Sequence, residues 1–226
     1  MSDEAAAIRF DHLVVACRTL AAGAAWCTAT FGVAPEPGGR HPMMGTHNLL
    51  LDVSSARFPQ AYLELIAIDP GAPAASEPRW FELDDAAMQA TLAEPRLVHW
   101  GSRSVDIGAA FSRLQRAGHD LGRIVAAERM TPRGLLRWRI TLPAGGRRPA
   151  GGAVPLVIEW GDVHPADSLP TSDVTLEALE VAGLSAEAAA LLGPQVSRGD
   201  GAAPLSAVLR SPRGRVVLAA PARLSA

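Results

Sequence analysis

The sequence predicts an α+β fold in which tandem β-α-β-β-β modules form a curved mixed sheet around a central cavity, followed by a truncated β-α-β-β extension. Two observations support this prediction. Strand-like and helix-like segments follow one another in the same order twice, over residues 8–68 and 95–162. In both copies a histidine lies on the first predicted strand and a glutamate on the last. A chain of 226 residues with 48% hydrophobic side chains is long and apolar enough to bury the core of such a fold.

The first module begins with a predicted strand over residues 9–17, which are rich in β-branched and apolar side chains. The alanine-rich segment 20–31 predicts a helix that ends at Gly32. An extended piece with prolines and glycines follows over residues 33–40. Two apolar strands then complete the module, and they are predicted at residues 47–53 and 61–68.

The second module follows a connector over residues 69–94, which is rich in Pro and Ala and holds a short predicted helix. Asp106 is a suitable N-cap for the second module's helix, and Gly118 ends it. The predicted strands of this module cover residues 96–104, 123–130, 135–142 and 155–160.

A third group of elements is predicted over residues 170–222. Apolar segments there predict a strand, a short helix and two strands joined by a hairpin turn at residues 211–214. We expect this group to be a truncated copy of the module. Its open strand edges could pair with another chain, so assembly, for example into a homodimer, is one interpretation.

Composition excludes several classes of function. All 21 basic residues are arginine, which removes Schiff-base and phosphate-loop lysines, and no nucleotide cofactor is expected. The formal net charge of -2, without a basic cluster, argues against nucleic-acid or membrane partners. Without an apolar stretch of about 18 residues, the expectation is a cytoplasmic protein. Cys17 and Cys27 are expected to be small core residues.

The recurring histidines and glutamates are the strongest candidates for a functional site. His12 and His99 are separated by 87 residues, and Glu64 and Glu159 by 95, and the difference of 95 − 87 = 8 residues is expected to lie in loops. Strand alternation predicts that all four side chains point to one concave surface. Imidazole and carboxylate ligands suit a divalent metal such as Zn, Ni, Mn or Fe, and Glu64 and Glu159 are the predicted catalytic bases.

The glycine-rich segment 38–48 is a second candidate. It carries His41, Thr46 and Asn48, whose donors and acceptors are predicted to bind a polar substrate beside the cavity. The alternative is a structural loop in which these side chains satisfy local backbone groups.

Three arginines on strand faces are the remaining candidates. Arg103, Arg137 and Arg139 are predicted to bind an anionic substrate if they enter the cavity, since a guanidinium pairs with carboxylates. Equally, they could neutralise Glu64 and Glu159 in a metal-free site. Trp138 and Trp160 lie on the opposite, apolar strand faces and are predicted to be core residues. His119, in a turn, and His164, in a link, are predicted to be exposed.

Several segments resemble the glyoxalase-like domain family of the vicinal oxygen chelate superfamily. The resemblance covers roughly residues 8–162, and its motifs are FDHLV at 10–14, GGRHP and GTHN within 38–48, YLELI at 62–66, LRWR at 136–139 and PLVIEW at 155–160. It implies a metal-assisted lyase or isomerase acting on a small oxygenated metabolite, which could be an anion. It also implies the alternative of a non-catalytic protein that sequesters a small molecule in a metal-free pocket, as resistance proteins of this superfamily do.

Overall fold

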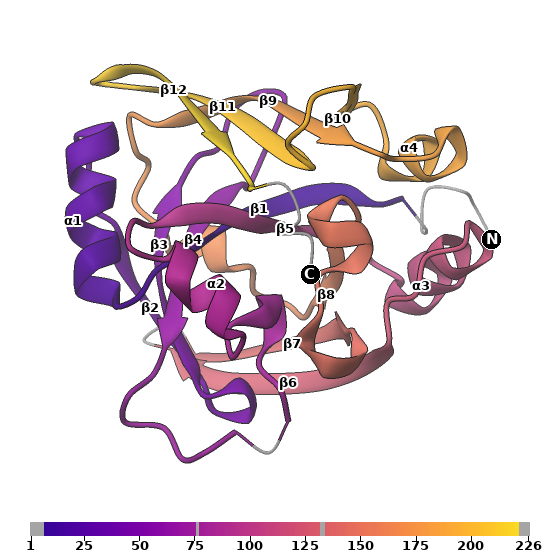
Figure 1. Cartoon of the computed structure of the whole chain (residues 1–226), viewed down its shortest axis with the longest axis horizontal. Coiled ribbons are helices and arrows are strands. Elements are labelled where there is room, and N and C mark those ends of the chain that lie inside the picture. The colour runs from indigo at the N-terminus through magenta and orange to yellow at the C-terminus, as the bar shows by residue number, and fades with distance from the viewer. Residues whose placement is uncertain (1–6, 76, 132–133, 222–226) are drawn as a thin grey trace.

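The computed structural model describes residues 7–75, 77–131 and 134–221 (Figure 1). Both predicted modules have the β-α-β-β-β order. The first module comprises β1 (Arg9–Ala16), α1 (Leu20–Phe31), β2 (Glu36–His41), β3 (Thr46–Asp52) and β4 (Tyr62–Ile68). The second comprises β5 (Arg96–Arg103), α3 (Ile107–Arg116), β6 (Arg123–Thr131), β7 (Gly134–Leu142) and β8 (Leu156–Trp160). Between them lie a 3-10 turn, Trp80–Glu82, and the helix α2 (Ala86–Thr91).

The helices begin and end where the sequence predicts them. The Thr19 side chain accepts a hydrogen bond from the backbone of Ala22 at the start of α1. Gly32 ends that helix in the left-handed conformation, with a φ of 80°, and its N–H donates to the carbonyl of Thr28. Asp106 caps α3 in the same way as Thr19 caps α1. The caps therefore fix the points at which each helix leaves the sheet.

The strands of both modules form one sheet in the order β2-β3-β4-β1-β5-β8-β7-β6. In each module the first strand pairs in parallel with the last, and β1 pairs antiparallel with β5 at the junction. His12 lies opposite Gly101, and Val14 lies opposite His99. Adding 87 to a residue number in β1 gives the equivalent residue in β5, so His12 is equivalent to His99 and Val14 to Gly101. Each of the two pairs is therefore equivalent to the other, and the modules are related by an approximate twofold axis at this junction.

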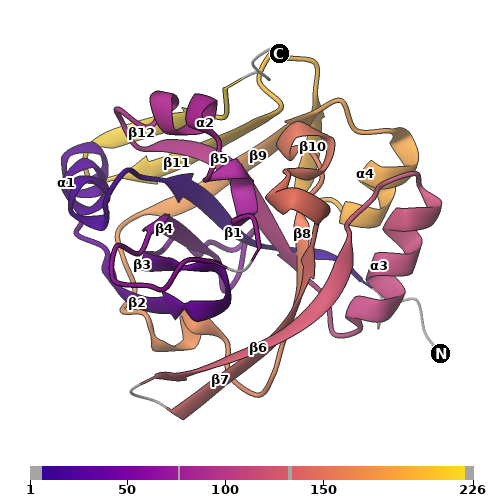
Figure 2. The same cartoon turned by 60° about the horizontal axis from the view of Figure 1, so that its bottom comes forward.

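The sheet curves until its two edge strands approach each other, as Figure 2 shows. Arg129 of β6 reaches β2 across this gap. A Cβ atom on Gly39 of β2 would lie 1.2 Å from Nη1 of Arg129, so only glycine at this position leaves room for the guanidinium. The concave side of the sheet consequently encloses space, while the convex side is open to packing.

The convex side carries most of the apolar core. Leu13 and Val15 of β1 point to that side, together with Leu63 and Leu65 of β4. The same core includes α1, α3 and the apolar side chains of the C-terminal extension. The alternate residues of β1, His12 and Val14, therefore face the concave side, as strand alternation predicts.

The C-terminal extension departs from its prediction. It contains β9 (Thr175–Ala182), α4 (Ala186–Leu192), β10 (Val196–Gly199), β11 (Leu205–Ser211) and β12 (Gly214–Ala219), which form a sheet in the order β10-β9-β11-β12. The unpredicted strand, β10, has only four residues and little hydrophobic pattern. Because this strand order differs from that of the modules, the extension is not a truncated copy of them.

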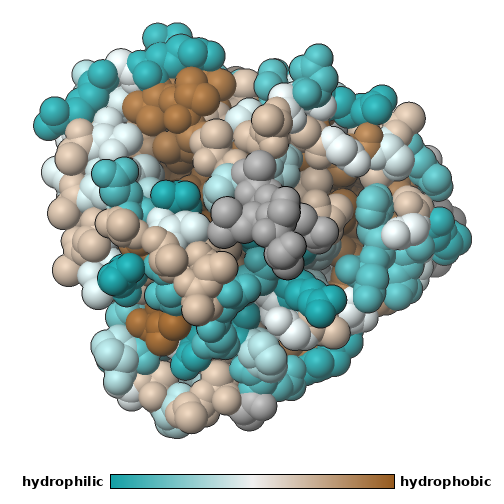
Figure 3. All heavy atoms as spheres, viewed as in Figure 1, coloured by the Kyte–Doolittle hydropathy of each residue, from teal (hydrophilic) through white to brown (hydrophobic). Residues whose placement is uncertain are grey.

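The extension lies over the central strands β1 and β5, between α1 and α3 (Figure 1). Its predicted end at residue 222 lies outside the described residues, as does residue 76 of the connector. Figure 3 shows polar and apolar atoms interspersed on this face of the molecule. Within the ranges that the structure describes, no helix combines the length and apolar character needed to span a membrane.

Candidate functional site

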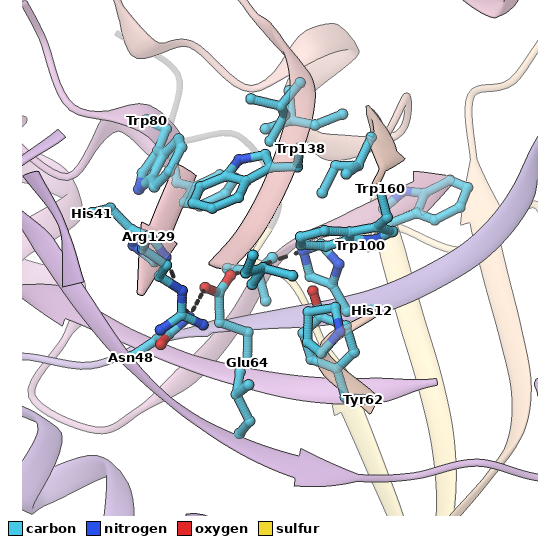
Figure 4. A pocket seen from close by; sticks show the side chains of 18 residues that line it. His12, His41, Asn48, Tyr62, Glu64, Trp80, Trp100, Arg129, Trp138 and Trp160 are labelled. Atoms are coloured by element: carbon cyan, nitrogen blue, oxygen red, sulfur yellow. Dashed lines mark hydrogen bonds and ion pairs between the residues drawn. The ribbon is translucent and has the colours of Figure 1, made fainter. Parts of the chain in front are cut away.

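The concave side of the sheet encloses a cavity with an empty volume of about 570 Å³ that includes its open mouth (Figure 4). Its lining comes from both modules and comprises His12, Val14, His41, Asn48, Leu50, Tyr62, Glu64, Trp80, Phe81, Trp100, Arg129, Leu136, Trp138, Ile140, Leu156, Ile158, Trp160 and Pro165.

The polar centre of the site is Asp11, a fully buried carboxylate that is not among the predicted site residues. Its Oδ1 lies 2.7 Å from Nδ1 of His12, and its Oδ2 lies 2.9 Å from Nε2 of His164. Trp160 Nε1 and Arg103 Nη1 also donate to Oδ2, at 3.1 and 3.4 Å. Burial alone raises the pKa of Asp11, but hydrogen bonds from His12 and His164 and their charges hold it well below its usual range.

Two neighbouring residues, Asp11 and His12, contact each other because β1 is irregular at this point. The pairing of β1 with β5 shifts register between Phe10 and His12. Such a bulge can re-aim a side chain that regular alternation would turn to the opposite face. The carboxylate therefore fixes the imidazole: an ionised carboxylate only accepts, so Nδ1–H of His12 donates to Asp11, and Nε2 faces the cavity.

Glu64 lies beside His12 Nε2. Its Oε2 is 3.8 Å from His12 Nε2, and its Oε1 accepts a hydrogen bond of 2.6 Å from Asn48 Nδ2. The backbone N–H of Gly39 donates to Asn48 Oδ1 at 2.7 Å, which sets the orientation of the amide. Glu64 is 7% exposed, so its carboxylate is held almost without solvent. Figure 4 shows Glu64 and His12 pointing into the same space.

The glycine-rich segment supplies one wall of the cavity. His41 Nδ1 lies 3.1 Å from Thr46 Oγ1, and its Nε2 lies 3.4 Å from Asn48 Nδ2. Burial, followed by the positive charge of Arg129, lowers the pKa of His41 to about 3. His41 is therefore neutral near pH 7, and it lines the cavity together with Asn48. Thr46 lies behind them and is 1% exposed, so it supports His41 from outside the lining.

Arg129 is the cation of the cavity, although it was not among the predicted residues. None of the residues in the described ranges gives its Nε atom a hydrogen-bond partner. Burial lowers the pKa of Arg129, an effect that Glu64 and Tyr62 oppose. Alternation along β6 could have identified it, because Val125 and Ala127 pack on the apolar concave side.

Aromatic side chains make up most of the remaining wall. Trp80 and Phe81 come from the connector, and Trp138 and Trp160 from β7 and β8. Trp138 packs in the concave core and is 9% exposed, but it also lines the cavity, so its predicted role as core is incomplete. Tyr62 stacks on the His12 ring at 4.7 Å between centroids.

His99 occupies the position equivalent to His12, as predicted, but it does not reach the cavity. It is fully buried against Phe81, with 5.4 Å between ring centroids, and is not part of the lining. No described residue forms a hydrogen bond with either of its ring nitrogens. Burial, and then the charge of Arg148, lower its pKa to about 3.

Glu159 lies on the opposite face of the sheet from Glu64. Its carboxylate accepts hydrogen bonds from the backbone of Ile107 at 2.9 Å and from Arg139 at 3.0 Å. The pairing between the first and last strands of each module explains this placement. In the first module Val14 pairs with Glu64, and in the second the equivalent of Val14, Gly101, pairs with Leu156. Leu156 is thus the true counterpart of Glu64. Glu159 comes three residues later, and an odd shift along a strand turns a side chain to the other face.

The three candidate arginines also lie outside the cavity. Arg137 and Arg139 point outward and pair with Glu128 and Glu159, at 3.1 and 3.0 Å. Trp138, between them, takes the concave side. Arg103 lies at the end of β5, where it donates to the backbone carbonyl of Pro59 at 2.8 Å as well as to Asp11. The predicted neutralisation of Glu159 by an arginine is present, but on the outer surface.

His164 is buried, against the prediction that it is exposed, and it connects the chain after β8 to Asp11. The backbone N–H of Ala166 donates to its Nδ1 at 3.1 Å, so Nε2 carries the proton that is donated to Asp11. A histidine beside a proline in a link gives no sequence signal for this role.

The predicted four-ligand metal site does not fit this geometry. Of its members, only His12 and Glu64 face the same space. In the parts of the chain that the structure describes, no three His, Cys, Asp or Glu side chains are grouped so that they could hold a metal ion.

Comparisons with known proteins agree with this architecture. A comparison with curated protein sequences gives no match. Among solved structures, a hypothetical protein from Staphylococcus aureus is 16% identical with a TM-score of 0.51, and the match covers 77% of this chain and 69% of that one. Methylmalonyl-CoA epimerase from Mycobacterium tuberculosis is 20% identical with a TM-score of 0.39, covering 66% and 84%.

The family comparison is more extensive. The sequence model of a family described as a glyoxalase-like domain matches residues 10–196, which includes both modules and the start of the extension. The chain belongs to the glyoxalase-like domain family.

Proposed function

We propose that the protein is an isomerase or lyase that moves a proton on a small, oxygenated, anionic substrate, with His12 as the base. The observation that carries this proposal is the free Nε2 of His12, which faces the cavity beside Glu64 while Asp11 holds Nδ1. The mechanism requires only side chains that the fold brings together. The predicted metal-assisted mechanism requires Glu159 and His99, which lie elsewhere.

The surroundings of His12 favour a base that becomes charged during the reaction. Nε2 takes a proton from a carbon next to a substrate carbonyl group, and the imidazolium that forms lies between two carboxylates. Asp11 is 2.7 Å from Nδ1, and Glu64 is 3.8 Å from Nε2. In an isomerisation, the imidazolium returns this proton to the enolate at a different atom or from the opposite face. In an elimination, the enolate re-forms the carbonyl as the bond from the β-carbon to the leaving group breaks, and the imidazolium gives its proton to that group. General-base catalysis of this kind contributes about 10²- to 10⁴-fold.

Arg129 indicates that the substrate is an anion. Its Nε has no hydrogen-bond partner among the described residues, and a guanidinium can bind a carboxylate with two parallel hydrogen bonds. The charge also stabilises the enolate oxygen that develops when a carbon next to a carbonyl group loses its proton. The indole rings of Trp80 and Trp138 would pack on the apolar part of a planar substrate.

Deuterium exchange tests this proposal with simple 2-oxo acids in place of the natural substrate. The protein is treated with EDTA and incubated in D2O with 2-oxobutanoate and, separately, phenylpyruvate, and loss of the C3 proton signal is followed by NMR. We expect exchange above the rate without protein, and a loss of about 100-fold in Glu64→Gln, which removes a carboxylate beside the imidazolium. Exchange that appears only after addition of Zn, Ni, Mn or Fe would contradict the proposal.

The aromatic wall also favours a second function, the sequestration of a small molecule. Six large aromatic side chains, Tyr62, Trp80, Phe81, Trp100, Trp138 and Trp160, line one narrow cavity and provide contact area for a bound ring. The two functions differ in one measurement. If phenylpyruvate quenches the fluorescence of the cavity tryptophans but its C3 proton does not exchange, the protein binds this anion without catalysing proton transfer.

A further inference from the structure

The segment after β8, residues 161–170, crosses one side of the cavity, and we call it the strap. Pro165 of the strap lines the cavity itself. A second hollow, with an empty volume of about 730 Å³, lies between the strap and the edge strands. It shares Leu50, Arg129, Leu136 and Pro165 with the cavity. On this side of the cavity, the strap therefore lies between the space around His12 and the surface.

The strap has its own local structure, which is organised by His164. Its 3-10 turn, Pro165–Ser168, has His164 as N-cap: Nδ1 of His164 accepts from Ala166, and Asp167 accepts from the backbone of His164 at 3.0 Å. Gln60, outside the strap, donates to Asp167 at 2.8 Å. Beyond the backbone hydrogen bond from Gly161 to Arg137 beside β8, the strap is held by an exposed contact with Gln60 and a buried one with Asp11.

We infer that His164 is a positioning residue: by donating to Asp11, it holds this carboxylate in the orientation that keeps the proton of His12 on Nδ1. The inference rests on the proposed function, because it assigns a purpose to that orientation. Asp11 has two oxygens, and each is assigned to one histidine. Without the short contact from His164, Oδ2 keeps only the longer ones from Trp160 and Arg103, and the orientation of the carboxylate toward His12 is less firmly held.

The other contacts of Asp11 do not replace this one. Trp160 donates to Oδ2 at 3.1 Å, and Arg103 at 3.4 Å, both longer than the 2.9 Å of His164. Arg103 is also shared between the carbonyls of Gln60 and Pro59, at 3.0 and 2.8 Å. His164 is consequently the donor with the shortest contact to Oδ2, and it ties the strap to the carboxylate that holds His12.

Imidazole NMR on the full chain labelled with ¹⁵N tests the inference without a substrate. His164→Phe keeps a ring that can pack against Tyr62 and Trp160, 5.9 and 5.5 Å from the His164 ring, but it donates nothing. His164→Gln retains an N–H donor. Gln60→Asn loosens the strap at its other attachment, and Asn tolerates the φ of 51° at this position.

We expect the wild type, His164→Gln and Gln60→Asn to show His12 with its proton on Nδ1. In His164→Phe, the ¹⁵N shifts of the two nitrogens should approach each other, and any exchange activity should fall about tenfold in kcat with little change in KM. Unchanged His12 signals in both His164→Phe and His164→Leu would overturn the inference. So would an equal change in Gln60→Asn, which would assign the effect to a loose strap. Because the NMR measurement involves no substrate, its result is independent of whether the exchange proposed above is observed.

Discussion

Replacement of His99 by Leu should make the stability of the protein less sensitive to acid. His99 is fully buried, and its pKa is lowered from 6.5 to about 3 by burial and by the charge of Arg148. In the unfolded chain, the same imidazole takes up a proton below about pH 6.5. The folded state binds fewer protons than the unfolded state between pH 6.5 and 3, so the free energy of unfolding falls as the pH falls through that range.

The size of this effect follows from the two pKa values. At about pH 5, the difference of 1.5 units from the unfolded pKa corresponds to about 2 kcal/mol, at about 1.4 kcal/mol per unit. Urea unfolding at about pH 7.5 and 5 measures it. The wild type should lose about 2 kcal/mol more than His99→Leu between these pH values. His41, whose pKa is also lowered to about 3, contributes equally to both proteins and cancels.

An equal loss of stability in both proteins would refute this reasoning. It would mean that His99 becomes protonated in the folded state at about pH 5, and that the structure opens to solvent at this position. A difference of the opposite sign would also contradict it, because Leu has no proton to gain.

Further changes give separate tests. Arg129→Gln should weaken phenylpyruvate binding, measured by tryptophan fluorescence, about 10- to 100-fold, while binding of the methyl ester changes little. Gly39→Ala should displace the Arg129 guanidinium, because its Cβ would lie 1.2 Å from Nη1, and should weaken phenylpyruvate binding with little change in urea stability; unchanged binding would show that Arg129 acts from another position. Asn48→Leu should destabilise the protein by about 1–3 kcal/mol in urea, because Glu64 loses its donor while buried; wild-type stability would show that water replaces the amide. Cys17 and Cys27, whose pKa values burial raises to about 12, should react with iodoacetamide at about pH 8 only after unfolding, and rapid labelling of the native protein would contradict their burial.

The sequence was sufficient to predict the two modules because the features that reveal them, apolar alternation in the strands and capping residues at the helices, reflect local chemistry. Alternating apolar residues predicted that His12 and Glu64 face away from the helices, and the structure places them so. The helix caps at Thr19 and Asp106 satisfy backbone donors that any helix exposes.

The errors arise where a prediction depended on the register between strands. The spacing of 95 residues between Glu64 and Glu159 differs from the 87 between the histidines, and loops alone were expected to hold the difference. The structure shows that the counterpart of Glu64 is Leu156, so the spacing at this strand is 156 − 64 = 92. A single sequence does not reveal how many of the extra residues belong to a loop.

Asp11 and His164 were missed for a different reason. A bulge in β1 interrupts the regular alternation at Asp11, so the face of this side chain could not be predicted. The strap places His164 in contact with Asp11, which lies 153 residues earlier in the sequence. Both depend on tertiary contacts. Arg129, in contrast, could have been found, because it is a charged residue in register with Val125 and Ala127.

The central claim, that His12 acts as a base without a metal, is tested most directly by comparing His12→Gln with His99→Leu in the deuterium exchange assay with EDTA. The two histidines occupy equivalent positions of the two modules, but only His12 lines the cavity. We expect His12→Gln to lose exchange at least about 100-fold while His99→Leu retains it. Equal losses in both variants, or exchange by His12→Gln at the wild-type rate, would contradict the assignment of His12 as the base.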